Sequence, residues 1–224
     1  MVLVVVFLVE VVLVEVGKMF EKIKSVLGDN LVSIIKYDVG FVERFLFVLK
    51  DIDILVLDKV KPFFQPVFLF LTKESVVNGV DVFPLEFFNI KTDHEVVFGE
   101  DIFESLNFDK EHIRRQLEFE FRSKLIHLRQ EYLSLKGKGL RSVIFAAVPV
   151  LTPLLKGMAF LKNISVSEDG LIDKVSHAFD EDLSVLKDIE LLKQKNSRMV
   201  DEDLLVQRLM LLLKNLGAKL DKLS

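Results

Sequence analysis

Two carboxylates separated by one residue are the side chains of this sequence best suited to chemistry. Asp51 and Asp53 flank Ile52, and the apolar run that follows predicts a buried strand over 52–57. Side chains alternate along an extended chain, so both acids would point to one face. A hard cation such as Mg²⁺ would relieve their repulsion and could also bind substrate phosphates. Because Asp-x-Asp is a short and common pattern, spacing alone favours two acids that end a strand in a solvated turn.

Composition narrows the classes of protein that the chain can be. Its 224 residues suffice for one large or two small domains, and a hydrophobic half with 29% charged residues is typical of a globular protein. The absence of cysteine excludes disulfides, thiolate zinc sites and cysteine nucleophiles. The net charge of -4 argues against a broad nucleic-acid surface, although a local basic face is compatible with it.

The first sixteen residues are almost wholly apolar, interrupted by Glu10 and Glu15. They lack the positive start of a secretory signal and fall short of the roughly 20 residues of a membrane span. We therefore expect a cytoplasmic protein with no membrane partner, and a short anchor is the alternative. Helical spacing predicts a helix over 8–27, which Gly28-Asp29-Asn30 would end.

The spacing of apolar residues in the sequence changes near residue 108. Before it, apolar runs predict strands over 31–37, 52–57, 67–71, 81–90 and 96–98. After it, helical spacing predicts helices over 109–135, 141–161, 172–179, 183–193 and 203–223, the second of them kinked or split by Pro149 and Pro153. We predict an α/β domain over 1–108 and a helical domain over 109–224. The leucine stripe of the last helix would either cap the bundle or form a homodimer.

Five strings of this sequence resemble the nucleotidyltransferase superfamily that includes DNA polymerase β and kanamycin nucleotidyltransferase. More closely, they resemble bacterial nucleotidyltransferase-domain proteins with a helical carboxy-terminal domain. The strings are Asn-Leu-Val-Ser-Ile-Ile-Lys-Tyr at 30–37, Asp-Ile-Asp-Ile-Leu-Val at 51–56, Val-Phe-Pro-Leu-Glu-Phe-Phe-Asn-Ile-Lys at 82–91, Phe-Gly-Glu-Asp at 98–101 and Arg-Ser-Lys-Leu-Ile-His-Leu-Arg-Gln at 122–130. The resemblance implies an α+β fold: a mixed sheet with flanking helices, followed by an all-α helical bundle.

The resemblance also implies a catalytic and metal-binding set. Asp51 and Asp53 would hold Mg²⁺, and Glu86 would be the third carboxylate. Asp81 is the rival for that third position, and strand register would decide between them. The reaction would be Mg²⁺-dependent transfer of a nucleoside monophosphate from a nucleoside triphosphate to the hydroxyl of an unknown acceptor, with pyrophosphate leaving. Glu86 equally fits an exposed position on an edge strand, as Pro84 suggests.

The triphosphate loop departs from the family pattern. Where family members have Gly-Ser after the position of Tyr37, this chain has Asp38 and Val39. The backbone freedom of glycine and the serine hydroxyl are lost, and Asp38 brings negative charge to the place of the phosphates. Among nearby residues, Arg44 and Lys50 are the cations left to bind a nucleotide. We therefore predict impaired transfer, with an inactive nucleotide-sensing or protein-interaction protein as the alternative.

Phenylalanine crowds the segment that follows, from Phe41 to Phe70. These side chains predict an apolar core more than a base-stacking surface. We interpret 41–49 as an added helix that lies across the active-site cleft implied by the resemblance.

The helical half carries a different hypothesis. Arg122 and His127 have the Arg-x4-His spacing of helical ribonucleases, in which His acts as acid or base and Arg stabilises phosphate. The same helix carries acids and bases three or four residues apart. That pattern favours a solvated face, although Arg122 or Arg129 could also face a substrate phosphate.

Overall fold

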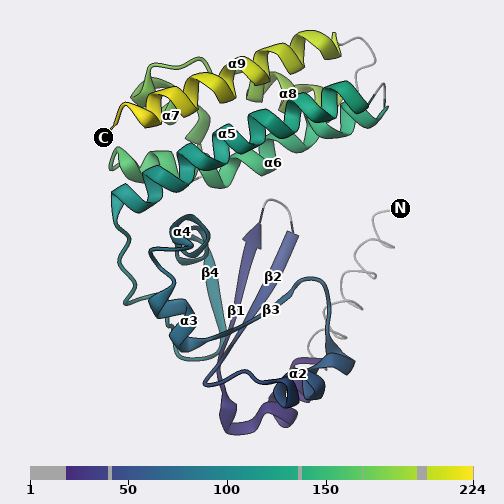
Figure 1. The fold of residues 1–224 in the computed structure, drawn as a ribbon, viewed down its shortest axis with the longest axis vertical. Coiled ribbons are helices and arrows are strands. Elements are labelled where there is room, and N and C mark those ends of the chain that lie inside the picture. Colours follow the sequence, from purple (N-terminus) through teal and green to yellow (C-terminus); the bar gives the residue numbers. More distant parts are fainter. Residues whose placement is uncertain (1–18, 40–41, 136–137, 168, 196–200, 224) are drawn as a thin grey trace. The chain divides into compact units, whose positions relative to one another are not determined.

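The structure is a computed structural model that describes residues 19–39, 42–135, 138–167, 169–195 and 201–223. Residues 19–27 are helical. The elements that follow are η1 (Gly28–Asn30), β1 (Leu31–Val39), β2 (Val42–Leu49), α2 (Ile54–Val60), η2 (Lys61–Phe63), β3 (Phe68–Thr72), α3 (Lys73–Asn78), α4 (Pro84–Thr92), β4 (His94–Gly99), α5 (Lys110–Ser134), α6 (Lys138–Leu161), α7 (Leu171–Phe179), α8 (Ser184–Lys195) and α9 (Glu202–Asp221) (Figure 1). The chain is α+β, with a mixed sheet before a helical region, as the sequence predicted.

The chain forms two compact units that interleave along the sequence. Of the described residues, the first unit contains 19–38, 42–78 and 94–105, and the second contains Val39, 79–93 and those from 106 onward. A boundary between folding domains at residue 108 stays a prediction.

The four strands of the first unit form one sheet in the order β3-β2-β1-β4. β1 pairs antiparallel with β4, and β2 pairs parallel with β3. Only two residues connect β1 and β2, which are hydrogen-bonded neighbours, so these strands form an antiparallel hairpin (Figure 1). The strands predicted over 31–37, 67–71 and 96–98 are thus confirmed as β1, β3 and β4.

One face of the sheet is built from aromatic rings, because β2 and β3 present phenylalanine at alternate positions. Phe45, Phe47 and Phe68 are buried together with Phe20, which lies in the helix before β1. Ring centroids of Phe20 and Phe45 are 4.8 Å apart, and those of Phe47 and Phe68 are 5.1 Å apart, in edge-to-face geometry. The predicted phenylalanine core is confirmed for these residues, whereas Phe41 lies outside the described residues.

The second unit contains a helical bundle, and its last helix contributes leucine side chains to the core. The predicted helices correspond to α5 to α9, and the leucines of α9 at 205, 209, 212, 213, 216 and 220 are buried in its core. α9 therefore caps the bundle, while dimer formation stays a prediction. α6 continues as one helix through Pro149 and Pro153. Its segment Gly139–Leu161 is the one helix of the described residues long and apolar enough to cross a membrane, but half of that window is buried inside the protein.

Three sequence predictions about secondary structure are wrong. The run after Asp53 is helix α2, not a strand, because the Asp53 carboxylate accepts the Val56 backbone N–H (2.7 Å) and begins a helix. The segment 81–90 is mostly helix α4, in which Pro84 takes the first helical position. The described part of 41–49 is strand β2, since alternate phenylalanines meet the aromatic core.

Candidate functional site

Charged and polar side chains gather where β1 ends and β2 begins. We call this place the hairpin end: residues 36–39 of β1, residues 42–44 of β2, and His94 and Glu95 of β4. In the register of β1 with β4, Lys36 lies opposite Glu95 and Tyr37 lies opposite His94. Three of the predicted nucleotide-binding residues, Asp38, Val39 and Arg44, belong to the hairpin end, and the first two are exposed.

A lysine between two glutamates occupies one face of the hairpin end. The Lys36 ammonium lies 3.0 Å from a Glu95 carboxylate oxygen and 3.4 Å from a Glu43 carboxylate oxygen. The hydrogen bonds that Lys36 donates to Glu95 and then to Glu43 raise its pKa above its ordinary value of 10.5. These three residues come from three neighbouring strands, and their mutual positions follow from the pairing of β2, β1 and β4.

The opposite face of the hairpin end carries Tyr37. Burial raises the pKa of its phenol, although the positive charge of Arg44 acts in the other direction. The buried Nε of Arg44 has no hydrogen-bond partner among the described residues. Beside Tyr37, the His94 ring nitrogen Nε2 lies 3.1 Å from both carboxylate oxygens of Asp101.

The predicted metal ligands Asp51 and Asp53 lie at the other end of β2. From Arg44 to Asp51 the chain covers on the order of 20 Å of strand, at about 3.3 Å per residue. Both acids are exposed, and each carboxylate serves the local backbone: Asp51 Oδ1 accepts the Ile52 N–H (2.9 Å), and Asp53 Oδ1 caps α2. The backbone of Asp51 is also held at both its N–H and its carbonyl by the Asn30 side chain (3.0 and 2.9 Å). Lys50, which is exposed, lies at this end too.

The candidates for the third carboxylate are not on a strand. Glu86 lies in the first turn of α4, where Gln116 donates to its Oε2 (2.6 Å) and accepts the Leu85 N–H (2.9 Å). Asp81 is exposed in the turn before α4. Both residues belong to the second unit, whereas Asp51 and Asp53 belong to the first. Because neither Glu86 nor Asp81 lies on a strand, strand register cannot decide which of them would be the third carboxylate.

The described side chains do not fit the metal site that the resemblance implies. In the described part of the chain, no three or more His, Asp or Glu side chains come together where they could hold a metal ion. The carboxylates of Asp51 and Asp53 are engaged by backbone N–H groups. A metal-binding or catalytic role for Asp51, Asp53 and Glu86 stays a prediction from the sequence.

The ribonuclease candidates do not converge on α5. Five residues correspond to 500° of helical rotation, so Arg122 and His127 point about 140° apart. Arg122 instead pairs with Glu118 (2.8 Å) and Asp221 (3.5 Å), and His127 is exposed.

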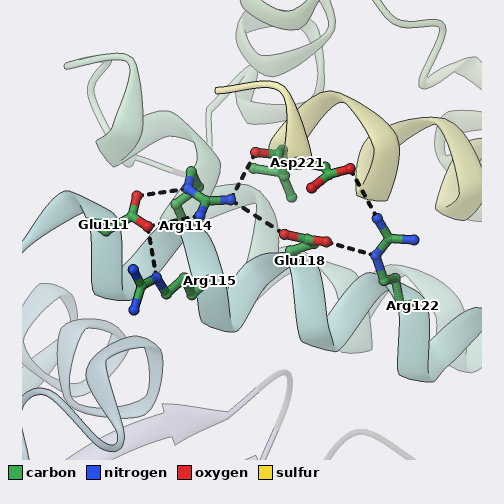
Figure 2. Close-up of polar contacts among 7 residues, drawn as sticks. Glu111, Arg114, Arg115, Glu118, Arg122 and Asp221 are labelled. Carbon is green, nitrogen blue, oxygen red and sulfur yellow. Dashed lines mark hydrogen bonds and ion pairs between the residues drawn. The ribbon is translucent and has the colours of Figure 1, made fainter. Parts of the chain in front are cut away.

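Figure 2 shows the ion pairs to which Arg122 belongs. Arg114, mostly buried, donates to Glu111 (2.8 Å), to Glu118 (3.3 Å) and to the Leu220 carbonyl of α9 (3.1 Å). This cluster thus ties the end of α9 to α5, which is a structural role.

Sequence reasoning missed Lys36, Glu43 and Glu95 as a group. Each is a charged residue directly beside an apolar residue of its strand, and that interruption was the available signal. Their proximity depends on strand order and register, which no single string contains.

Comparison with known proteins supports the fold at low sequence identity. No family model matches the chain, and no curated protein matches it. Among solved structures, the chain is similar to spectinomycin adenyltransferase from Enterococcus faecalis, whose structure was determined with ATP and spectinomycin. The TM-score is 0.55 at 12% identity, over 89% of this chain and 98% of that chain. The chain therefore has the fold of a nucleotidyltransferase-type mixed sheet followed by a helical carboxy-terminal region.

Proposed function

We propose that this chain is a protein-binding module built on the nucleotidyltransferase fold, and that it does not transfer nucleotidyl groups. The observation that carries the proposal is the separation of Asp51 and Asp53 from the hairpin end. In the implied reaction, the carboxylates must act on the α-phosphorus of a triphosphate whose other phosphates lie at Asp38 and Val39. The phosphates of one triphosphate are joined by bridging oxygens, so both sets of residues would have to lie beside one short ligand, and here they stand on the order of 20 Å apart along β2.

The charges at the hairpin end also oppose a triphosphate. Asp38, Glu43 and Glu95 supply three negative charges against the two positive charges of Lys36 and Arg44. Lys36 is already bound to two carboxylates (3.0 and 3.4 Å), so its ammonium is not available to a phosphate. Like charges at short range cost free energy, and nucleotide binding here would be weak.

A surface of α5 supports the binding role. Phe119, Ile126 and Leu133 recur every seven residues, and 67%, 57% and 77% of their surfaces are exposed. Arg115, Arg122 and Arg129 each precede one of them by four residues, on the same face of the helix. We call these six residues the α5 seam. One exposed apolar residue in each seven forms an apolar line along the helix, against which the apolar face of a second helix can pack.

The charge of the α5 seam selects the partner. In a parallel pair, a second copy of α5 would place arginine against arginine. In an antiparallel pair, it would place arginine against an apolar residue. In both arrangements the second copy offers the arginines no acidic residue of its own. The partner we propose is therefore an amphipathic helix of another protein, with acidic residues beside its apolar ones. Arg115 and Arg122 already pair with Glu111 and Glu118, but such surface pairs are weak enough to exchange.

Assays of nucleotide binding and of nucleotidyl transfer test whether the site is inactive. We expect no transfer of α-labelled nucleotide to water or to added hydroxyl acceptors. We also expect no change in melting temperature with any triphosphate and Mg²⁺. Asp53→Asn should behave identically, because asparagine still caps α2. A Mg²⁺-dependent rise in melting temperature that Asp53→Asn abolishes would refute the proposal and restore the transferase.

Binding of synthetic peptides tests the α5 seam. One helical peptide repeats leucine every seven residues with glutamates beside it, and its matched control has lysines in place of the glutamates. Fluorescence anisotropy should show the glutamate peptide binding at least tenfold more tightly than the lysine peptide. Ile126→Asp should abolish this binding, whereas His127→Asp, one position off the seam, should not. Equal binding of both peptides, or self-association through α5 in sedimentation, would contradict the proposal.

A further inference from the structure

The three arginines of the α5 seam differ in the acids that already surround them. Arg115 lies 2.7 Å from a carboxylate oxygen of Glu111, and Arg122 lies 2.8 Å from one of Glu118 (Figure 2). Arg129 is exposed and forms no ion pair or side-chain hydrogen bond with any residue that the structure describes. Among the described residues, its charge is therefore not matched by an acid of this chain.

The sequence explains why Arg129 has no acidic partner on its own helix. Side chains on a helix meet those three and four positions away, and Arg115 and Arg122 each have a glutamate four residues before them. Glu131 is two positions from Arg129, a separation at which side chains do not face each other. The residues three and four positions from Arg129 are all apolar or aromatic: Leu125, Ile126, Tyr132 and Leu133.

Exposed apolar surface surrounds this unpaired guanidinium. Ile126 and Leu133 are 57% and 77% exposed, and Tyr132 is 40% exposed, with its hydroxyl donating to Asp203 (3.2 Å). Arginine and tyrosine beside apolar residues are the side chains that contribute most to binding energy in protein interfaces. This end of the α5 seam therefore has the composition of a binding centre.

An incoming carboxylate meets different charges along the α5 seam. At Arg115 or Arg122 it approaches a resident glutamate as well as the arginine, and it must displace that glutamate to form a new pair. Like charges at short range repel, and the exchange of one exposed ion pair for another gains little free energy. At Arg129 the carboxylate meets the positive charge without a resident acid.

We propose that Arg129 is the residue of the α5 seam that selects an acidic partner helix. The partner therefore needs its glutamate or aspartate at the Arg129 end of the contact, whereas acids beside Arg115 and Arg122 add little. This inference rests on the proposed function and adds to it the position at which the acid of the partner is recognised.

The experiment compares arginines within the seam, using the glutamate peptide and the lysine peptide described above. Fluorescence anisotropy gives the affinity of each peptide for wild type, Arg129→Met and Arg115→Met, because methionine keeps the apolar stem and removes the charge. We expect Arg129→Met to bind the glutamate peptide at least fivefold more weakly than wild type, without weaker binding of the lysine peptide. Arg115→Met, the matched control, should change either affinity by less than twofold, and Arg129→Lys should keep most of the wild-type preference.

A converse variant tests whether a resident acid is what silences the other arginines. Glu111→Gln removes the one acid that pairs with Arg115 among the described residues. In the Arg129→Met background, this substitution should restore at least twofold of the lost affinity for the glutamate peptide. Circular dichroism of each variant confirms that the helices are retained.

The outcomes separate this inference from the proposed function. Equal losses in Arg129→Met and Arg115→Met, while wild type still prefers the glutamate peptide, would overturn the role of Arg129 and leave the binding module standing. Equal weakening of both peptides by Arg129→Met would overturn it too, because the side chain would then act through packing rather than charge. No preference for the glutamate peptide in wild type would refute the proposed function, and this inference with it.

Discussion

Arg114 is the side chain that holds the end of α9 to α5, and its removal has a calculable effect. Only 11% of this side chain is exposed, and it donates to the Leu220 carbonyl across the helix pair and to Glu118 of its own helix (Figure 2). Methionine keeps most of the apolar stem and loses the donors. A hydrogen bond from a charged donor contributes about 1.5–3 kcal/mol, so we expect Arg114→Met to lower the free energy of unfolding by about 2 kcal/mol.

Urea unfolding followed by circular dichroism measures this loss, and the slope with denaturant should not change. Arg115→Met is the matched control: the neighbouring arginine is 70% exposed and pairs with Glu111 alone. Its unfolding midpoint should be indistinguishable from that of wild type. Equal midpoints for the two variants would refute the role of the Leu220 contact, because both variants lose one arginine from the same helix.

Three further predictions concern acid stability, a glycine and a helix cap. Hydrogen bonds from Arg114 and then Arg115 lower the pKa of Glu111 from 4.5 to about 2, so its contribution to stability is present above pH 4.5 and is lost as pH falls toward 2. The difference in urea midpoint between wild type and Glu111→Gln should shrink over that range, and a constant difference would contradict the assignment. Gly99→Ala should destabilise by more than about 4 kcal/mol, since its Cβ would lie 2.0 Å from the Val32 carbonyl at φ +81°, whereas Gly28→Ala has open space and should cost about 1 kcal/mol in the same measurement. Asp53→Ala should lose about 1 kcal/mol of stability through loss of the α2 cap while Asp53→Asn loses little, and equal losses would argue against capping.

Local patterns in the sequence predicted most elements of this fold. The spacing of Ile113, Leu117, Phe121, Leu125 and Leu128 predicted α5, and those side chains are buried. For β2 the sequence predicts a helix instead of a strand, because the run from Phe45 to Leu49 is apolar at every position and shows no alternation. Both faces of β2 are buried, so the period of two is hidden.

The candidate site was less predictable than the fold. Asp51 and Asp53 resemble a metal-binding pair, and only the structure shows Asp53 capping a helix whose first residues, Ile54 and Leu55, are 69% and 65% exposed. The hydrogen bonds that backbone N–H groups donate to Asp51 and Asp53 span only one to three residues. Whether the segment after Asp53 forms a strand or a helix depends on which of its apolar side chains are buried in the core.

The sequence by itself determined the helices of the second unit and three strands of the sheet, because each of these follows from neighbouring residues. Only the tertiary structure placed Lys36 between Glu43 and Glu95, and only it put Asp51 at the far end of β2. Those facts depend on strand order and register, which bring residues up to 59 positions apart in this chain (Lys36 and Glu95) to within 3.0 Å. Pairing of that kind is decided by the burial of whole faces of the sheet, and no local pattern of residue types encodes it.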